Sequence, residues 1–391
     1  MQKIVLIIIL STLNSFVSAQ TTNFGTQFSD AIIQRYQPSI DIMTNKGWDH
    51  ANSVILHGIE KTYLKSKNPK HLNYIKEFVD AHIDNKGTIS GLKPELDRIQ
   101  PGMICLFLYE KTGDNKYKLA ATYLKNYLLG TSSSPSVFNK TPDGGYWHKN
   151  DEDHTNVMSI DGAYMLNPFL AKYGTTFNDK ECIDAAVFQL LLVASRTFNI
   201  DSNLPYHGWS FDKNKPWANA ITGTSTEVWS RSVGWFSMAL VDVLEYLPKT
   251  HQEYNKVVYL FQQLAIGLKN TQNATDGMWY QLMSYKNLHE NYPEASGSGM
   301  IVYSLKKGVT NGWLDESFNT TINKGWDGLK NCIVTNNDGK VQINSFSPGM
   351  SIKNNAKEYI DVRPVNCPSP DEKQNPHGYF GILMAASQLE E

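Results

Sequence analysis

The chain has few cysteines, almost no net charge and no long hydrophobic run after its first twenty residues. Its 391 residues include four cysteines and carry a formal net charge of −2. The cysteine spacing shows no zinc pattern, and the lack of a basic patch argues against a nucleic-acid partner. No run after the start of the chain is long enough to cross a bilayer, and no basic amphipathic helix favours a membrane surface.

Motifs of nucleotide-dependent and acyl-transfer enzymes are also missing. The sequence contains no P-loop, no dinucleotide fingerprint and no Gly-x-Ser-x-Gly nucleophile elbow. The Gly/Ser-rich stretch 294–300 leads into an apolar helical pattern. Close helix packing or a sugar contact therefore explains that stretch better than a phosphate site does.

The first residues have the pattern of a secretory signal peptide. Lys3 precedes the apolar run 4–10, and small residues precede a cleavage point after Ala19. We therefore expect residues 1–19 to be removed and the protein to be exported, to the periplasm or the medium. No linker, charge run or low-complexity segment divides residues 20–391, which predicts a single domain.

The cysteines fall into two pairs by their surroundings. Cys105 and Cys182 lie within apolar helical patterns, which predicts buried thiols. Cys332 and Cys367 lie in a loop-rich region of a chain expected to be exported. A disulfide between these two is open, because sequence alone does not establish a pairing.

Helical periodicity dominates the rest of the chain. Between Thr226 and Leu247, apolar residues recur at spacings of three and four, and Thr224 with Glu227 forms a capping-box pattern before them. Strand signals are few and short. Further helices are predicted near 28–46, 51–65, 70–83, 98–112, 115–129, 158–173, 180–198, 252–270, 296–308, 315–331 and 377–390.

A second pattern recurs in the loops, where glycine precedes or follows an aromatic residue. It appears at 47–48, 145–147, 207–209, 277–279 and 377–379, mostly about one helical hairpin apart. Helix-pair repeats of this period build solenoids or closed toroids. If the helices alternate in direction, these loops gather at one end. We interpret the whole set as an aromatic binding rim, although any one loop could simply plug a helix end.

Arg231 stands in the first turn of the helix predicted at 226–247, where the helix dipole disfavours a cation. A nearby anion would explain its position, and a guanidinium beside a helix N-terminus would hold a carboxylate well. Trp235, one turn later, could stack beside that ligand. An ion pair between Arg231 and Glu227, four residues earlier, explains the pattern equally well.

Two acids have the surroundings of catalytic groups. Asp161 is a lone acid in an apolar stretch, and burial would raise its pKa as a general acid requires. Asp97 is followed three residues later by Gln100, which is itself a capping pattern. Helix capping is thus the alternative for both acids. If Asp97 faced Asp161, like-charge repulsion would raise one of the two pKa values further.

Several loop residues are candidates for sugar contact. His207 lies in an aromatic loop next to Trp209, without neighbours that would complete a metal site. Trp147 belongs to another aromatic loop, and His50 follows the first of them. Trp229 precedes Arg231 by two residues, which places it on the opposite face of the predicted helix.

Taken together, these segments resemble glycoside hydrolase family 105, the unsaturated rhamnogalacturonyl hydrolases. The matching pieces follow the order of the family and cover most of residues 20–391. They are the stretches 97–102, 144–149, 160–165, 207–209, 229–235, 276–279 and 377–381. Each motif is modest alone, but the ordered set is specific.

The resemblance implies an all-α fold, an (α/α)6 barrel, without a metal or organic cofactor. It implies Asp161 as general acid/base, with Asp97 as its acidic partner. It also places His207, Arg231, Trp235 and Trp229 in the sugar pocket, to which we add as candidates Trp209, His50 and Trp147.

The implied reaction removes a 4,5-unsaturated uronic acid from the end of an oligosaccharide. An acid protonates C4 of the enol ether, water adds at C5, and the resulting hemiketal opens. Ser159 stands where the family usually has tryptophan, which casts doubt on rhamnogalacturonan as the substrate. Lyase products of ulvan, other pectic chains or arabinogalactan side chains therefore remain open. The alternatives are an unsaturated glucuronyl hydrolase of the related family 88 and a non-catalytic periplasmic oligosaccharide-binding protein.

Overall fold

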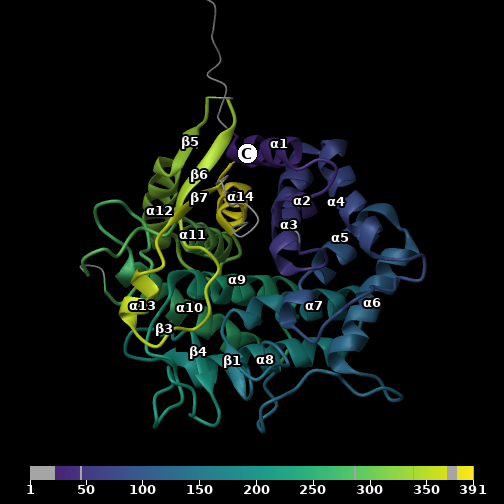
Figure 1. Ribbon diagram of the computed structural model, residues 1–391, viewed down its shortest axis with the longest axis horizontal. Helices are drawn as coiled ribbons and strands as arrows, with labels where there is room; N and C mark the ends of the chain where they lie inside the picture. Colours follow the sequence, from purple (N-terminus) through teal and green to yellow (C-terminus); the bar gives the residue numbers. More distant parts are fainter. Residues whose placement is uncertain (1–22, 45, 286–287, 338, 368–376, 391) are drawn as a thin grey trace, which may run out of the picture.

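A computed structural model describes residues 23–390 except residues 45, 286–287, 338 and 368–376. The predicted signal peptide therefore lies outside the described residues. Within them, twelve helices have eleven residues or more, and Figure 1 shows them wrapped into a ring. No described helix is both long enough and apolar enough to cross a membrane.

Six of these helices form an inner ring and six lie outside it. Neighbouring inner helices contact one another in the order α3, α5, α7, α9, α11 and α14, and α14 closes the ring against α3. The inner helices are α3 (His50–Ser66), α5 (Gly102–Thr112), α7 (Gly162–Phe177), α9 (Ser230–Tyr246), α11 (Ala295–Thr310) and α14 (His377–Leu389). The outer helices are α1 (Phe24–Arg35), α4 (Pro69–His82), α6 (Asn115–Leu129), α8 (Lys180–Thr197), α10 (Tyr254–Thr271) and α12 (Asn319–Asn331). The predicted all-α (α/α)6 barrel is confirmed.

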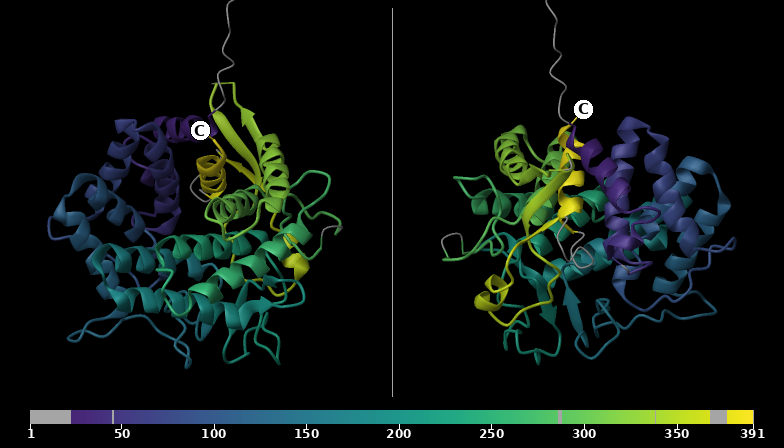
Figure 2. Two further views of the ribbon diagram at one scale, coloured as in Figure 1. Left: turned by 180° about the vertical axis from the view of Figure 1, so that it is seen from behind. Right: turned by 45° about the horizontal axis from the view of Figure 1, so that its top comes forward.

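The remaining elements are short and belong to the connections. The short helices are α2 (Asp41–Thr44), η1 (Leu96–Arg98), η2 (Glu316–Phe318) and α13 (Ala356–Ile360). The strands are β1 (Val157–Ser159), β2 (Phe198–Asn199), β3 (Leu204–Pro205), β4 (Gly208–Ser210), β5 (Ile333–Thr335), β6 (Val341–Phe346) and β7 (Val365–Cys367). All strand pairs are antiparallel: β1 with β4, β2 with β3, and β6 between β5 and β7. The three-stranded sheet lies beside α12 and α14 (Figure 2).

The inner helices are buried around most of their circumference because other helices cover them on both sides. On α9 every residue from Ser230 to Leu244 is buried. Glycine permits the tightest contact: a Cβ built on Gly299 of α11 would lie 2.4 Å from the backbone of Gly381 on α14. The Gly/Ser-rich stretch therefore serves close helix packing, one of the two explanations that its sequence favoured. Cys105 and Cys182 are fully buried free thiols, as predicted.

Three predicted boundaries were wrong for identifiable reasons. The helix expected over 28–46 is interrupted after Arg35, where Pro38 follows without an N–H to continue the hydrogen-bond ladder. The helix expected from 158 begins at Gly162, because 157–159 form strand β1. The helix expected from Thr226 begins at Ser230, since Trp229 pairs with Leu282 in an isolated β-bridge. The Thr224–Glu227 capping box does not form.

The disulfide left open by the sequence is not supported at Cys332. Cys332 is a partly buried free thiol, and burial raises its pKa to about 11. The side chain of Cys367 lies outside the described residues.

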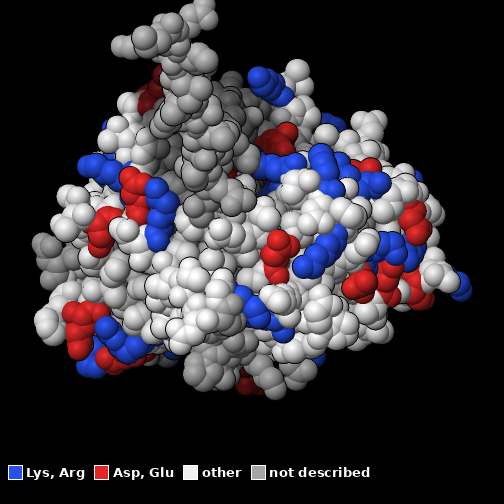
Figure 3. All heavy atoms as spheres, turned by 90° about the horizontal axis from the view of Figure 1, so that it is seen from above, with Lys and Arg blue, Asp and Glu red and all other residues white. Residues whose placement is uncertain are grey.

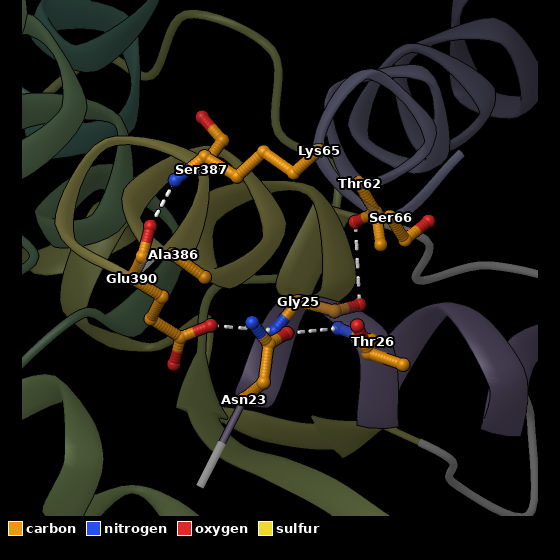
Figure 4. A pocket seen from close by; sticks show the side chains of 9 residues that line it. All are labelled: Asn23, Gly25, Thr26, Thr62, Lys65, Ser66, Ala386, Ser387 and Glu390. Carbon is orange, nitrogen blue, oxygen red and sulfur yellow. Dashed lines mark hydrogen bonds between the residues drawn. The ribbon is translucent and has the colours of Figure 1, made fainter. Parts of the chain in front are cut away.

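The two ends of the described chain are joined at helix α1. The first three N–H groups of the helix have no intrahelical acceptor but have side-chain acceptors: Glu390 accepts from Phe24 and Gly25 at 2.9 Å each, and the side chain of Asn23 accepts from Thr26 at 2.7 Å. Figure 4 shows the contacts of Gly25 and Thr26 beside a cavity of about 140 Å³. The last residues of the chain therefore cap its first helix and close the ring.

Replacing Glu390 with alanine should lower the free energy of unfolding by about 1 kcal/mol, because two buried N–H groups lose their acceptor. The expected effect is modest, since burial raises the pKa of Glu390 and offsets part of the gain. Urea denaturation measures the change. Glu152→Ala, which removes an exposed acid, is the matched control and should change stability by less than about 0.5 kcal/mol. Equal stability of the two variants would contradict the capping role.

Candidate active site

The N-termini of all six inner helices open at one end of the barrel, which we call the mouth. The connections that carry the glycine-aromatic pairs lead into these N-termini, as the alternating arrangement predicted. Each helix turns the positive end of its dipole toward the mouth. Some of their first N–H groups already have acceptors, since Glu294 caps α11 and Asp49 caps α3. Six such ends around one space favour an anionic ligand there.

The aromatic rings of these connections do not form the predicted rim. Trp48, Trp209, Trp279 and Tyr379 are buried, with exposed fractions of 6% or less. Trp48 stacks on Phe78, and the indole of Trp279 donates to the backbone of Leu268 at 2.8 Å. Trp48 and Trp279 thus fill gaps between inner and outer helices, and Tyr379, within α14, packs on Phe28 of α1. For these three residues the helix-plugging alternative was correct.

Asp161 occupies the N-cap position of α7 without capping it. Its side chain makes no cap hydrogen bond; instead its Oδ2 lies 3.3 Å from Nε2 of His207. The pairing of β1 with β4 creates this contact, because Ser159 pairs with Gly208 and brings the residues that follow and precede them together. The capping alternative for Asp161 is therefore excluded, and the structure brings Asp161 and His207 together.

The pKa of Asp161 is lower than the sequence suggested. Burial raises it, but the hydrogen bond from His207 and the electrostatic interactions with His207 and His148 outweigh burial and hold it below its ordinary value. The expectation of a raised pKa was wrong, because the partners of a carboxylate cannot be read from its own segment. In the free protein Asp161 is a carboxylate at neutral pH.

Asp97 lies in η1, just before α5, at the centre of an ion-pair network. Its carboxylate is 3.1 Å from Nε2 of His148, 3.5 Å from Nδ1 of His50 and 3.6 Å from Nζ of Lys149. Burial opposes ionisation, yet these three side chains hold the pKa of Asp97 well below its ordinary value. The capping alternative is excluded here too, since Asp97 lies inside η1 and the N-cap position of α5 is Pro101, without a side-chain cap.

His148 stands between the two acids. It binds Asp97 through Nε2, its charge lowers the pKa of Asp161, and its Nδ1 lies 3.4 Å from the position of a Cβ on Gly162. The pKa values of both acids are lowered rather than pushed apart. The like-charge repulsion that the sequence suggested is therefore screened by histidines and Lys149.

Asp49, His50 and Asp97 are the described residues whose donor atoms could hold a metal, since these atoms lie within 4.8 Å of one another. His50 Nδ1 is 3.1 Å from Asp49, and Arg98 lies 3.5 Å from the same carboxylate. Burial lowers the pKa of His50, but the two acids raise it above its ordinary value. Because cationic side chains already neutralise these acids, we assign the group to the ion-pair network.

Arg231 is buried at the start of α9, with 1% of its surface exposed. Its guanidinium donates to the carbonyl oxygens of Ser347 and Pro348, in the segment that follows β6. The predicted pairing with Glu227 is replaced by these contacts. A direct contact of Arg231 with a substrate carboxylate stays a prediction, and its positive charge acts on Asp161 in either case.

Trp229 is better placed than its helical position suggested. Since it precedes α9 in extended backbone, its ring turns toward the site: it lies 4.8 Å from the ring of His207 and 4.6 Å from the guanidinium carbon of Arg231. Trp235 lies deeper, stacked on Phe380 at 5.2 Å.

The remaining candidates divide between the mouth and the outside. Trp147 is partly exposed next to His148, and its indole donates to Asn156 at 3.2 Å. Trp209 was misplaced: its indole donates to Thr222, and it lines an outer groove of about 820 Å³. Strand β4 begins at Gly208, so the alternation of side chains along it does not extend back to His207. The sequence spacing of His207 and Trp209 therefore did not reveal that Trp209 faces the outside of the barrel.

Four residues near the acids were not among the predicted site residues. His148 and Lys149 directly follow the aromatic loop at 145–147, and this adjacency was an available signal. His377 opens α14, stacks on His50 at 5.4 Å, and has a pKa held well below its ordinary value by burial and Arg231. Tyr359 binds His207 from a segment 152 positions later, and no local pattern points to it.

The sequence matches the profile described as "Glycosyl Hydrolase Family 88" over residues 26–390. Protein Atu3128 of Agrobacterium fabrum is 33% identical over 147 residues, which are 38% of this chain and 62% of that protein. The unsaturated rhamnogalacturonyl hydrolase YesR of Bacillus subtilis is 21% identical over 81% of this chain and 83% of its own length. A solved glycoside hydrolase of family 105 from C. acetobutylicum superposes with a TM-score of 0.85 at 29% identity, covering 94% of this chain and 99% of that one.

Proposed function

Because the chain belongs to glycosyl hydrolase family 88, we propose that it is a hydrolase that removes a 4,5-unsaturated uronic acid from the end of an oligosaccharide. The observation that carries the proposal is Asp161 itself. It is a largely shielded carboxylate at the mouth, bonded to His207 rather than used as a helix cap. A single acid that first donates and then accepts a proton is sufficient for this reaction.

The electrostatics of the mouth support an anionic sugar. Six helix N-termini face it, and Arg231 and Lys149 add full positive charges. Lys149 is the more accessible cation, with 32% of its side chain exposed beside Asp97. We propose that a substrate carboxylate is drawn by this field and meets Lys149 first, while Arg231 acts as a buried charge.

The proposed reaction has two steps at the enol ether. Asp161, protonated once substrate is bound, transfers its proton to C4, and positive charge develops at C5 and the ring oxygen. Water then adds at C5 and returns a proton to the Asp161 carboxylate. The resulting hemiketal opens by breaking the bond between C5 and the ring oxygen, which leaves a ketone at C5 and a hemiacetal at C1. That hemiacetal then collapses to an aldehyde and releases the remaining oligosaccharide as an alcohol. Asp97 and its histidines orient the substrate and the water beside Asp161.

The neighbouring sugar subsite supports a narrower substrate range. Ser159 pairs with Gly208 in the β1–β4 ladder, two residues before Asp161. The related family usually has a tryptophan at this position, and serine offers no ring on which a sugar could stack. Without that stacking platform, we favour lyase products of ulvan, other pectic chains or arabinogalactan side chains over rhamnogalacturonan.

A panel of lyase digests tests the proposal. The conjugated double bond of each unsaturated product absorbs ultraviolet light, and the enzyme should remove that absorbance in at least one digest. If a digest binds in calorimetry but keeps its absorbance under all conditions, the protein is an oligosaccharide-binding protein instead. If none binds or reacts, the proposed substrate class is wrong.

A further inference from the structure

Tyr359 forms the third link of a chain that ends at Asp161. The phenol oxygen of Tyr359, on α13, lies 2.7 Å from Nδ1 of His207, whose Nε2 lies 3.3 Å from Asp161 Oδ2. Tyr359 and His207 are both buried, with 1% or less of their surfaces exposed. The histidine therefore bridges two groups from distant parts of the sequence.

The hydrogen bonds of Tyr359 fix the direction of this chain. The backbone N–H of Lys353 donates to the phenol oxygen at 3.3 Å, so that oxygen already serves as an acceptor. The phenol has one proton of its own, and among the described atoms its partner is Nδ1 of His207. Donating that proton to Nδ1 satisfies the phenol and makes Nδ1 the acceptor, which leaves the imidazole proton on Nε2, directed at Asp161.

We propose that Tyr359 is a positioning residue that fixes the Nε2–H tautomer of His207 and thereby orients Asp161 for proton transfer. This inference rests on the proposed function, because it gives Asp161 the role of acid and base. With the other tautomer, a lone pair of Nε2 would face the Asp161 carboxylate and repel it. The acid would then lose the hydrogen bond that holds it in place.

The second oxygen of Asp161 agrees with this arrangement. Oδ1 is buried and has no hydrogen-bond partner of good geometry among the described residues, nor does the nearby hydroxyl of Ser232. An unpaired buried carboxylate oxygen is costly, which indicates a functional reason for it.

The surroundings of Tyr359 hold it rigidly enough for this task. Its ring packs in a small apolar cluster with Trp229, Leu282 and Ile360. Gln281 connects the same group, since it accepts from the indole of Trp229 at 2.9 Å and donates to the backbone oxygen of Tyr359 at 3.4 Å. Burial also raises the pKa of Tyr359, so the phenol keeps its proton.

The variant Tyr359→Phe removes only the hydroxyl group. We expect kcat to fall by about ten- to a hundredfold with KM changed by less than about threefold, as when a partner that fixes a tautomer is lost. Tyr74→Phe is the matched control, because it removes a buried hydroxyl that donates to the backbone of Tyr36 at 2.6 Å, on the outer helix α4. It should leave kcat unchanged.

The tautomer is measured directly by nitrogen-15 NMR of histidine-labelled protein, with the His207 signals assigned by their loss in His207→Asn. Wild type should show a protonated Nε2 and an unprotonated Nδ1, and Tyr359→Phe a mixture. A protonated Nδ1 in wild type overturns the inference even if the variant does not fold. So does an active wild type whose Tyr359→Phe variant keeps full kcat. Failure of every digest would instead overturn the proposed function and leave the tautomer result standing.

Discussion

Replacing Asp161 with asparagine should lower kcat by about a thousandfold, because asparagine can neither donate the proton to C4 nor accept one from water. Binding should remain, since the amide is of the same size and its oxygen can still accept from His207 Nε2–H at the same position. The loss of ultraviolet absorbance measures turnover, and calorimetry measures binding. Asp143→Asn, which breaks an ion pair with Arg196 on the outside of the barrel, should keep full activity. Full activity of Asp161→Asn would remove the central assignment.

The same variant should also lose the proton uptake that accompanies binding. Asp161 is ionised in the free enzyme because its pKa lies below its ordinary value. A substrate carboxylate placed nearby favours the neutral acid and raises that pKa. Wild type should therefore take up about one proton from the buffer on binding near neutral pH, whereas Asp161→Asn should not. Calorimetry in two buffers with different ionisation enthalpies measures the difference, and equal uptake by both proteins would contradict the mechanism.

The order and approximate extent of the long helices could be predicted from periodicity alone. Apolar spacing of three and four is a local signal, and each helix satisfies its own backbone hydrogen bonds. Apart from the interruption before Pro38, the errors occurred where pairing with a distant strand or bridge partner decided the local structure. Trp229 follows the helical pattern of the residues after it, but pairing with Leu282 keeps it extended.

A site residue could be predicted when it belongs to one of the ordered motifs or when its contact partner lies close to it in the sequence. The resemblance placed Asp161 and His207 in one pocket, and the structure shows them in contact. The ligands of Arg231 could not be predicted, because they are backbone carbonyls 116 and 117 positions away. Every residue type has a backbone carbonyl, so a contact with one does not constrain the residue type and produces no sequence pattern.

At the opposite end of the barrel, a buried ion pair should have the largest effect on stability. Lys307 of α11 donates to Asp242 of α9 at 2.7 Å, Tyr303 donates to the same carboxylate oxygen at 2.7 Å, and Glu245 also contacts the lysine. Asp242 and Lys307 are almost fully buried. Burial opposes both charges, yet their attraction lowers the pKa of Asp242 and raises the pKa of Lys307.

The variant Lys307→Met should therefore lower the free energy of unfolding by about 3–5 kcal/mol at pH 7, because it leaves the charge of Asp242 buried without its cation. Lys180→Met breaks an exposed ion pair with Asp184 at 2.9 Å and, as the control, should change stability by less than about 1 kcal/mol. The double variant with Asp242→Asn should be more stable than Lys307→Met alone, since the unpaired charge is gone. Urea denaturation measures all of these changes.

The pH dependence separates this explanation from a simple loss of packing. In wild type, the lowered pKa of Asp242 means that its contribution is present above the ordinary value and is lost as pH falls through the folded-state value. In Lys307→Met, burial without a cation raises that pKa, so folding then favours the protonated acid. The stability difference between the two proteins should therefore shrink as pH is lowered from 7 toward 5. A difference that stays constant over this range would show that the methylene packing of Lys307, and not its charge, stabilises this end of the barrel.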